Sequence, residues 1–230
     1  MHDAALYAAA TGGALLLGAA LGCFRAPPKQ LTAGMLAFAS GALVVAVAFE
    51  LFEPAHRQAG LARASVALLV GAATFIAVDV LLQRHAGAQA AGLALVAAVT
   101  LDGVPENLAL GVGLAESASY ALLASIVLSN LPEAFSGAAK MRQGGASQAR
   151  VLSVWGVTAV LLAVALVAGR AAADVAPGQW LGMLTAFAAG AVLASLADSV
   201  MPQAYAEGGP LVAFATSGGF LLAYALTTLD

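Results

Sequence analysis

Charged side chains are so sparse in this chain that water cannot be its main solvent. Of the 230 residues, 62% are hydrophobic and only 9% are charged. A soluble globular domain carries roughly 25% charged residues, so a water-soluble fold of this size could not cover its own surface. A lipid bilayer suits such a surface, because helices satisfy their backbone groups internally. The sequence therefore predicts an integral membrane protein.

Apolar stretches of about 20 residues, the length that crosses a bilayer as a helix, follow one another along the chain. Short polar, proline-rich or glycine-rich segments separate them and leave no room for a soluble domain. No basic segment of the kind that opens a cleaved signal precedes the first stretch, so we expect it to be a span. We predict one all-α transmembrane domain over residues 1–230, with eight helices near 4–24, 31–52, 64–83, 90–114, 117–140, 150–169, 179–201 and 210–229.

The basic residues of the expected loops are divided unevenly between the two sides of the membrane. Loops on the side away from the termini hold six of them, namely Arg25, Lys29, Arg84, Lys140, Arg142 and Arg150. Loops on the side of the termini hold three, namely Arg57, Arg63 and Arg170. Because cytoplasmic loops usually carry the excess, we expect a multi-pass cell-membrane protein with both termini extracytoplasmic.

Two stretches of similar sequence indicate an internal repeat. Residues 37–42 read AFASGA and residues 186–191 read AFAAGA, and each stretch continues into an acid, Glu50 or Asp198, and then a proline. The two helices run in opposite directions across the membrane. The pattern therefore predicts an inverted repeat of helices 1–3 and 6–8 around a central pair, an organisation common in secondary transporters.

Six acidic residues fall within or near the expected spans, and no lysine or arginine lies in a span interior. The acids are Glu50, Asp79, Asp102, Glu106, Glu133 and Asp198. A charged side chain at mid-bilayer costs about 2.5–3.5 kcal/mol on insertion scales, so several unpaired acids would cost on the order of 10 kcal/mol. Without a basic partner, protons, water or a bound cation must offset this cost.

The two central helices carry related motifs at the same depth. Residues 101–106 read LDGVPE and residues 128–133 read LSNLPE, on either side of a turn expected near Glu116–Ser117. Counted from that turn at about 1.5 Å per residue, both motifs lie near the middle of the membrane and can face each other. Residues three or four apart share a helical face, which groups Asp102 with Glu106 on one helix and Asn130 with Glu133 on the other.

A proline precedes the glutamate in each motif. Pro105 leaves the carbonyl of Leu101 without its helical donor, and Pro132 does the same to Leu128. Interrupted helices with free carbonyls are how membrane proteins build cation sites, and an all-oxygen set suits a divalent cation of hard to borderline character. Plain helix kinks, and protonated carboxyls that hydrogen-bond between helices, are the structural alternatives.

These motifs resemble those of the Zrt/Irt-like (ZIP) family of metal transporters, which carries HNxPEG-like motifs in its fourth and fifth helices. Residues 102–107 (DGVPEN) and 129–134 (SNLPEA) are similar to those two motifs, and residues 38–50 and 189–202 resemble the patterns of its second and seventh helices. The resemblance implies a metal site bridged between helices 4 and 5 and uptake toward the cytoplasm. It also implies movement of helices 1, 4, 5 and 6 against the rest, and a homodimer.

Position by position, the resemblance assigns ligands to both motifs. Asp102 stands where the family has a histidine, whereas Glu106 and Glu133 match its two glutamates. Ser129 stands where histidine or glutamine is usual, and Asn130 matches asparagine or aspartate. Every motif histidine is missing, and because imidazole favours zinc over harder ions, manganese and ferrous iron join zinc and cadmium as expected cargo.

We therefore expect a transporter of a divalent cation, with no prosthetic group and no enzymatic activity. The expected metal ligands are Asp102, Glu106, Ser129, Asn130 and Glu133, with Glu50 and Asp198 lining the pathway. The expected partners are the lipid bilayer, the metal ion and a second copy of the chain, and no nucleic acid. Two alternatives remain open: a proton-coupled transporter of another solute, and a metal sensor or assembly subunit that transports nothing.

Overall fold

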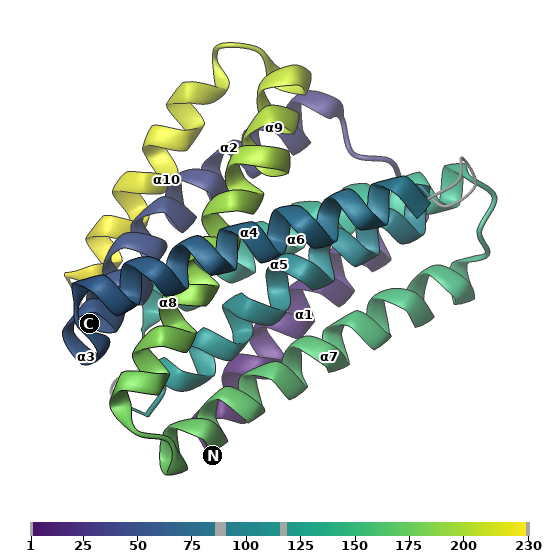
Figure 1. The fold of residues 1–230 in the computed structure, drawn as a ribbon. Coiled ribbons are helices and arrows are strands. Elements are labelled where there is room, and N and C mark those ends of the chain that lie inside the picture. Colours follow the sequence, from purple (N-terminus) through teal and green to yellow (C-terminus); the bar gives the residue numbers. More distant parts are fainter. Residues whose placement is uncertain (1, 86–90, 116–118, 229–230) are drawn as a thin grey trace.

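The protein is a bundle of long helices (Figure 1). The computed structural model describes residues 2–85, 91–115 and 119–228, and this part of the chain contains no strand. The long helices are α1 (His2–Phe24), α2 (Lys29–Val45), α4 (Leu61–His85), α5 (Ala91–Gly113), α6 (Tyr120–Gln143), α7 (Gln148–Val175), α8 (Gly178–Ser195) and α10 (Val212–Thr227). Four shorter segments extend α2 and α8, namely η1 (Ala46–Phe52), α3 (Glu53–Ala59), η3 (Leu196–Val200) and α9 (Met201–Gly208).

Six helices of the described residues are long and apolar enough to cross a membrane by length and composition, which is compatible with a multi-pass membrane protein. They cover Asp3–Phe24, Lys29–Ala59, Leu61–Leu82, Tyr120–Gln143, Gln148–Val175 and Gly178–Gly208. Helix α10 is a shorter apolar helix. The all-α fold is thus confirmed, whereas the count of eight spans stays a prediction.

Both π-helical segments lie where an acid was expected near a helix end. Segment η1 carries Glu50 and continues into α3, and segment η3 carries Asp198 and continues into α9. Pro54 and Pro202 lie at the start of α3 and α9, directly after the two π segments, and neither proline ends the helix. The predicted helix ends at 52 and 201 are therefore too early, because α3 and α9 continue to Ala59 and Gly208.

The first of these extended helices ends at Gly60, whose φ of 80° favours glycine. Residues 56–58, expected in a loop, lie inside α3 instead. Four other expected features fall outside the described residues: the turn at Glu116–Ser117, and helix limits at 90, 117 and 229.

Glycine contacts join α2 to α10 and α4 to α8 at van der Waals distance between backbones. A Cβ added to Gly41 would lie 1.9 Å from the carbonyl oxygen of Thr216 in α10. A Cβ on Gly190 of α8 would lie 1.9 Å from the carbonyl oxygen of Leu68 in α4. Small residues that let helix backbones approach closely are typical of helix packing in membranes.

The helices fall into two groups by their packing. Helices α1, α5, α6 and α7 pack mainly on one another, whereas α2 packs on α10 and α4 packs on α8. The groups meet where α2 contacts α6 and where α5 contacts α8. Both termini lie at the lower left in Figure 1, at the same end of the bundle as the α3–α4 and α7–α8 turns; we call this the terminal end.

Candidate functional site

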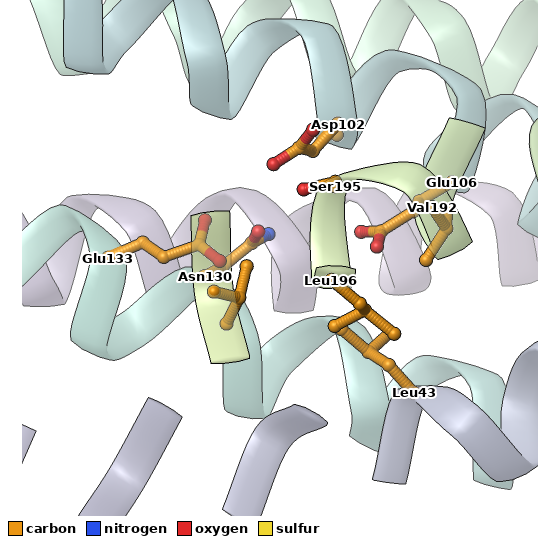
Figure 2. A pocket seen from close by; sticks show the side chains of 10 residues that line it. Leu43, Asp102, Glu106, Asn130, Glu133, Val192, Ser195 and Leu196 are labelled. Carbon is orange, nitrogen blue, oxygen red and sulfur yellow. The ribbon is translucent and has the colours of Figure 1, made fainter. Parts of the chain in front are cut away.

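Carboxylates from α5 and α6 point into one small space between the two helix groups (Figure 2). Asp102 and Glu106 enter it from α5, and Asn130 and Glu133 enter it from α6. The space, which we call the central cavity, has a volume of about 10 Å³, enough for about one water molecule. The structure thus brings together four of the residues that the two motifs single out.

The second helix group closes the central cavity. Val192 and Ser195 of α8, Leu196 of η3 and Leu43 of α2 lie against it (Figure 2). Ser195 is the only polar side chain among these four, and it is 2% exposed. Four polar or acidic side chains from the first group therefore face a lid that is apolar apart from one hydroxyl.

Asp102 of the central cavity has a carboxylate oxygen that no hydrogen bond from the described residues satisfies, and Glu106 beside it is 4% exposed. The Ser195 side chain lines the cavity together with Asp102, while the Oδ1 atom of Asp102 is buried and has no partner in the described part of the chain. Buried polar atoms of this kind are costly unless water or an ion contacts them.

The charges around the cavity are all of one sign. Asp102 and Glu106 lie close enough for their charges to repel, and Glu133 is within range of both. Asp79 of α4 and Asp198 of η3 add further negative charge near Asp102. No lysine, arginine or histidine is among the described residues that line the cavity. Among the described lining residues, no positive side chain offsets these carboxylates.

The carboxylates of the central cavity do not by themselves form a complete coordination shell for a metal ion. Among the described residues, no group of three or more His, Cys, Asp or Glu side chains lies close enough to hold a metal ion. An ion in this cavity would therefore be held by fewer carboxylates at once. Asn130, a water molecule and backbone carbonyls would complete its shell of oxygen ligands.

The two neighbouring polar residues of α6 play different parts. Asn130 is 2% exposed and donates its amide hydrogen to the carbonyl of Thr11 in α1 at 3.3 Å. That bond fixes the amide and leaves Oδ1 as an acceptor beside the cavity. Ser129 instead donates to the carbonyl of Ile126 at 3.1 Å and does not line the central cavity. The structure therefore does not place Ser129 with the other predicted ligands.

The structure also keeps Glu50 and Asp198 apart from the central cavity. Glu50 lines a second space, the outer cavity, together with Gln58, Ser119 and Thr185. Its volume is about 60 Å³. Asp198 is exposed on η3 and lines neither space. Both residues were predicted to line a pathway rather than to hold the central ion, and neither touches that cavity.

Two polar residues of this region were not predicted as site residues. Ser195 belongs to an apolar helix, and only its spacing of three residues from Asp198 could have pointed to it. Asn107 follows Glu106 directly, is fully buried, and donates its amide hydrogen to the carbonyl of Gly103 at 2.9 Å. Its Oδ1 atom is buried without a partner among the described residues, although Asn107 does not line the central cavity.

Comparison with known proteins adds no relative to this picture. No known family model and no curated protein sequence matches the chain. Its function must therefore be argued from its own residues.

Proposed function

We propose that this chain carries a divalent metal cation across a membrane, in the manner of the Zrt/Irt-like family that its motifs resemble. The observation that carries the proposal is that Asp102, Glu106 and Glu133 all line one cavity whose described lining residues include no basic side chain. Unpaired carboxylates at the depth of hydrocarbon cost several kcal/mol in total. A divalent cation offsets two such charges at once.

The proposed ligands are side chains that already point into the central cavity. Glu106 and Glu133 supply carboxylates from α5 and α6, with Asp102 one helical turn away and Asn130 as a neutral oxygen donor. Because three carboxylates do not close on one point, small side-chain rotations would pass the ion between pairs of them. A set made of oxygen atoms favours manganese and ferrous iron among the expected ions, with zinc as a borderline ion and cadmium as the softest of the four.

The size of the central cavity supports a metal ion rather than a larger solute. A volume of about 10 Å³ holds about one water molecule, and an organic cation would need several times that space. A proton-coupled carrier of an organic solute is therefore less well supported than a metal carrier. A sensor that binds metal without moving it shares the same site and must be separated by flux.

We further propose eight spans in an inverted repeat, with both termini extracytoplasmic. The paired contacts α2–α10 and α4–α8, each made through a glycine, support the repeat, as do the two acid-bearing π segments. The cations at the terminal end include Arg57, paired with Glu53, and Arg170, paired with Asp174. The opposite end keeps the larger basic excess that cytoplasmic loops carry.

The test is metal flux into proteoliposomes that hold the purified protein. The wild type should carry Mn²⁺ or Zn²⁺ inward down its gradient, and the Glu106→Ala, Glu133→Ala double variant should lose this flux. Glu53→Gln is the matched control, because Glu53 lies outside both cavities and pairs with Arg57. Unchanged flux in the double variant would rule the site out. Metal-dependent stabilisation without flux would favour the sensor.

A further inference from the structure

We propose that the outer cavity is a second cation-binding site, separate from the central one, in which a divalent cation keeps part of its water shell. The inference rests on the proposed function and adds to it a place where the ion stops before it reaches Glu106 and Glu133. The argument uses the lining of the outer cavity, its size, and what separates it from the central cavity.

The lining of the outer cavity offers oxygen ligands from four elements. Glu50 contributes a carboxylate from η1, Gln58 an amide oxygen from α3, and Thr185 a hydroxyl from α8. Ser119, the N-cap of α6, contributes a second hydroxyl. No lysine, arginine or histidine is among the described lining residues. One carboxylate with several neutral oxygens is the donor set of a weak site for a hard cation.

The hydroxyl hydrogen-bonding pattern leaves lone pairs for a cation. The hydroxyl of Thr185 donates its proton to the carbonyl of Leu181 at 2.9 Å, so its oxygen can act only as an acceptor toward the cavity. The Ser119 oxygen accepts from the backbone N–H of Leu122 at 3.0 Å and keeps a further lone pair. Thr185 is 7% exposed and Ser119 is 9% exposed, so both are held in place by packing.

The difference in size between the two cavities sets how much water the ion can keep. The outer cavity has about 60 Å³ and the central cavity about 10 Å³. A water molecule needs about 10–15 Å³ measured in this way. The outer cavity therefore has room for an ion with several waters, whereas the central cavity takes a nearly bare ion. An ion that moves from one to the other must exchange its water for Asp102, Glu106 and Glu133.

The two cavities share none of their described lining residues, and each is lined in part by buried apolar side chains. Leu110 and Leu122 line the outer cavity, while Leu43, Val192 and Leu196 line the central one. All five belong to one buried cluster, and each is at most 3% exposed. Along α5, Leu110 lies four residues beyond Glu106, or about 6 Å at the rise of an α-helix. The two cavities are thus close neighbours along α5.

Counting bound Mn²⁺ by electron paramagnetic resonance tests the inference on the purified full-length protein. The paramagnetic resonance signal of free Mn²⁺ decreases as the ion binds, and the decrease gives the number of ions bound at each concentration. The wild type should bind two ions, one more weakly than the other. Glu50→Gln should weaken the second ion at least tenfold and leave the first unchanged. Glu106→Gln with Glu133→Gln should remove the first ion and leave the second.

Two further variants guard against effects on folding. Glu53→Gln removes a neighbouring acid that lines neither cavity and should bind as the wild type does. Thr185→Val keeps the side-chain shape, removes one oxygen, and should weaken only the second ion, by at least threefold. Unchanged binding in Glu50→Gln, or loss of all Mn²⁺ in the Glu106, Glu133 double variant, would overturn the outer site. Two bound ions without flux would refute transport and leave the outer site standing.

Discussion

Replacing Gly41 with alanine tests the helix packing that positions α2 beside the central cavity. The added Cβ would lie 1.9 Å from the carbonyl oxygen of Thr216, a backbone atom that no rotamer change can move away. Ordinary contact begins at 3.4 Å, so α2 and α10 must separate by about 1.5 Å, the difference between these distances. Gly34, on the same helix, has no atom within 4 Å of an added Cβ and provides the matched control.

The expected magnitude follows from two opposing effects. A gap of 0.5–1 Å already forfeits a quarter to a half of the van der Waals attraction, and overpacking costs about 1–3 kcal/mol. Alanine in place of glycine stabilises the helix by up to about 1 kcal/mol, because alanine has the higher helix propensity. Gly41→Ala should therefore lower the free energy of unfolding by up to about 2 kcal/mol, whereas Gly34→Ala should raise it by up to about 1 kcal/mol.

Reversible unfolding in mixed micelles, followed by circular dichroism, measures both variants against the wild type. Gly190→Ala repeats the test at the matching α8–α4 contact, where the Cβ would lie 1.9 Å from the carbonyl oxygen of Leu68, and should cost a similar amount. The reasoning fails if Gly41→Ala proves as stable as Gly34→Ala, because the close backbone contact would then not exist.

The remaining predictions concern a buried amide and the orientation of the chain. Asn130→Leu should lower the free energy of unfolding by about 0.5–1.5 kcal/mol, since it removes the buried amide hydrogen bond to the carbonyl of Thr11; thermal unfolding measures this, and an unchanged midpoint would contradict it. In a cysteine-free background in whole cells, an impermeant thiol reagent should label Gln179→Cys, after α7, but not Gln148→Cys, after α6. The reverse pattern would place the termini in the cytoplasm.

The sequence predicted those parts of the fold that depend on residues near one another in the chain. Apolar runs and their separators locate the long helices, because each helix satisfies its own backbone. Two predicted helix ends, at residues 52 and 201, are too early. Pro54 and Pro202 follow these ends, yet each lies at the start of a helical segment that continues behind a π segment. Each π segment is only one or two turns long, so it leaves no hydrophobic repeat in the sequence by which it could be predicted.

The central cavity was predictable in part for the same reason. Asp102, Glu106, Asn130 and Glu133 lie on two consecutive helices, so counting residues from one turn places them at a common depth. Ser129 lies next to Asn130, but a step of one residue rotates the side chain by about 100°, and its hydroxyl bonds the carbonyl of Ile126 instead. Depth alone does not tell which side chain faces the neighbouring helix.

The lid of the cavity could not be predicted, because it depends on contacts between helices far apart in sequence. Ser195 reaches Asp102 across more than 90 residues, and Leu43 and Val192 arrive from two different helices. In a chain rich in alanine, leucine and valine, nothing local marks such residues. Separating Glu50 into its own cavity likewise depends on how α5 and α6 pack against η1 and α8.

Packing also bears on how an ion could reach the closed central cavity. The acids belong to the group of α1, α5, α6 and α7, while Leu43, Val192 and Leu196 of the lid belong to the other group. Asn130 ties α6 to α1 within the first group, and glycine contacts tie α2 to α10 and α4 to α8 within the second. The boundary between acids and lid is thus the boundary between groups. Sliding there would uncover the carboxylates without breaking these contacts, which favours movement of one group against the other over local unfolding of a helix.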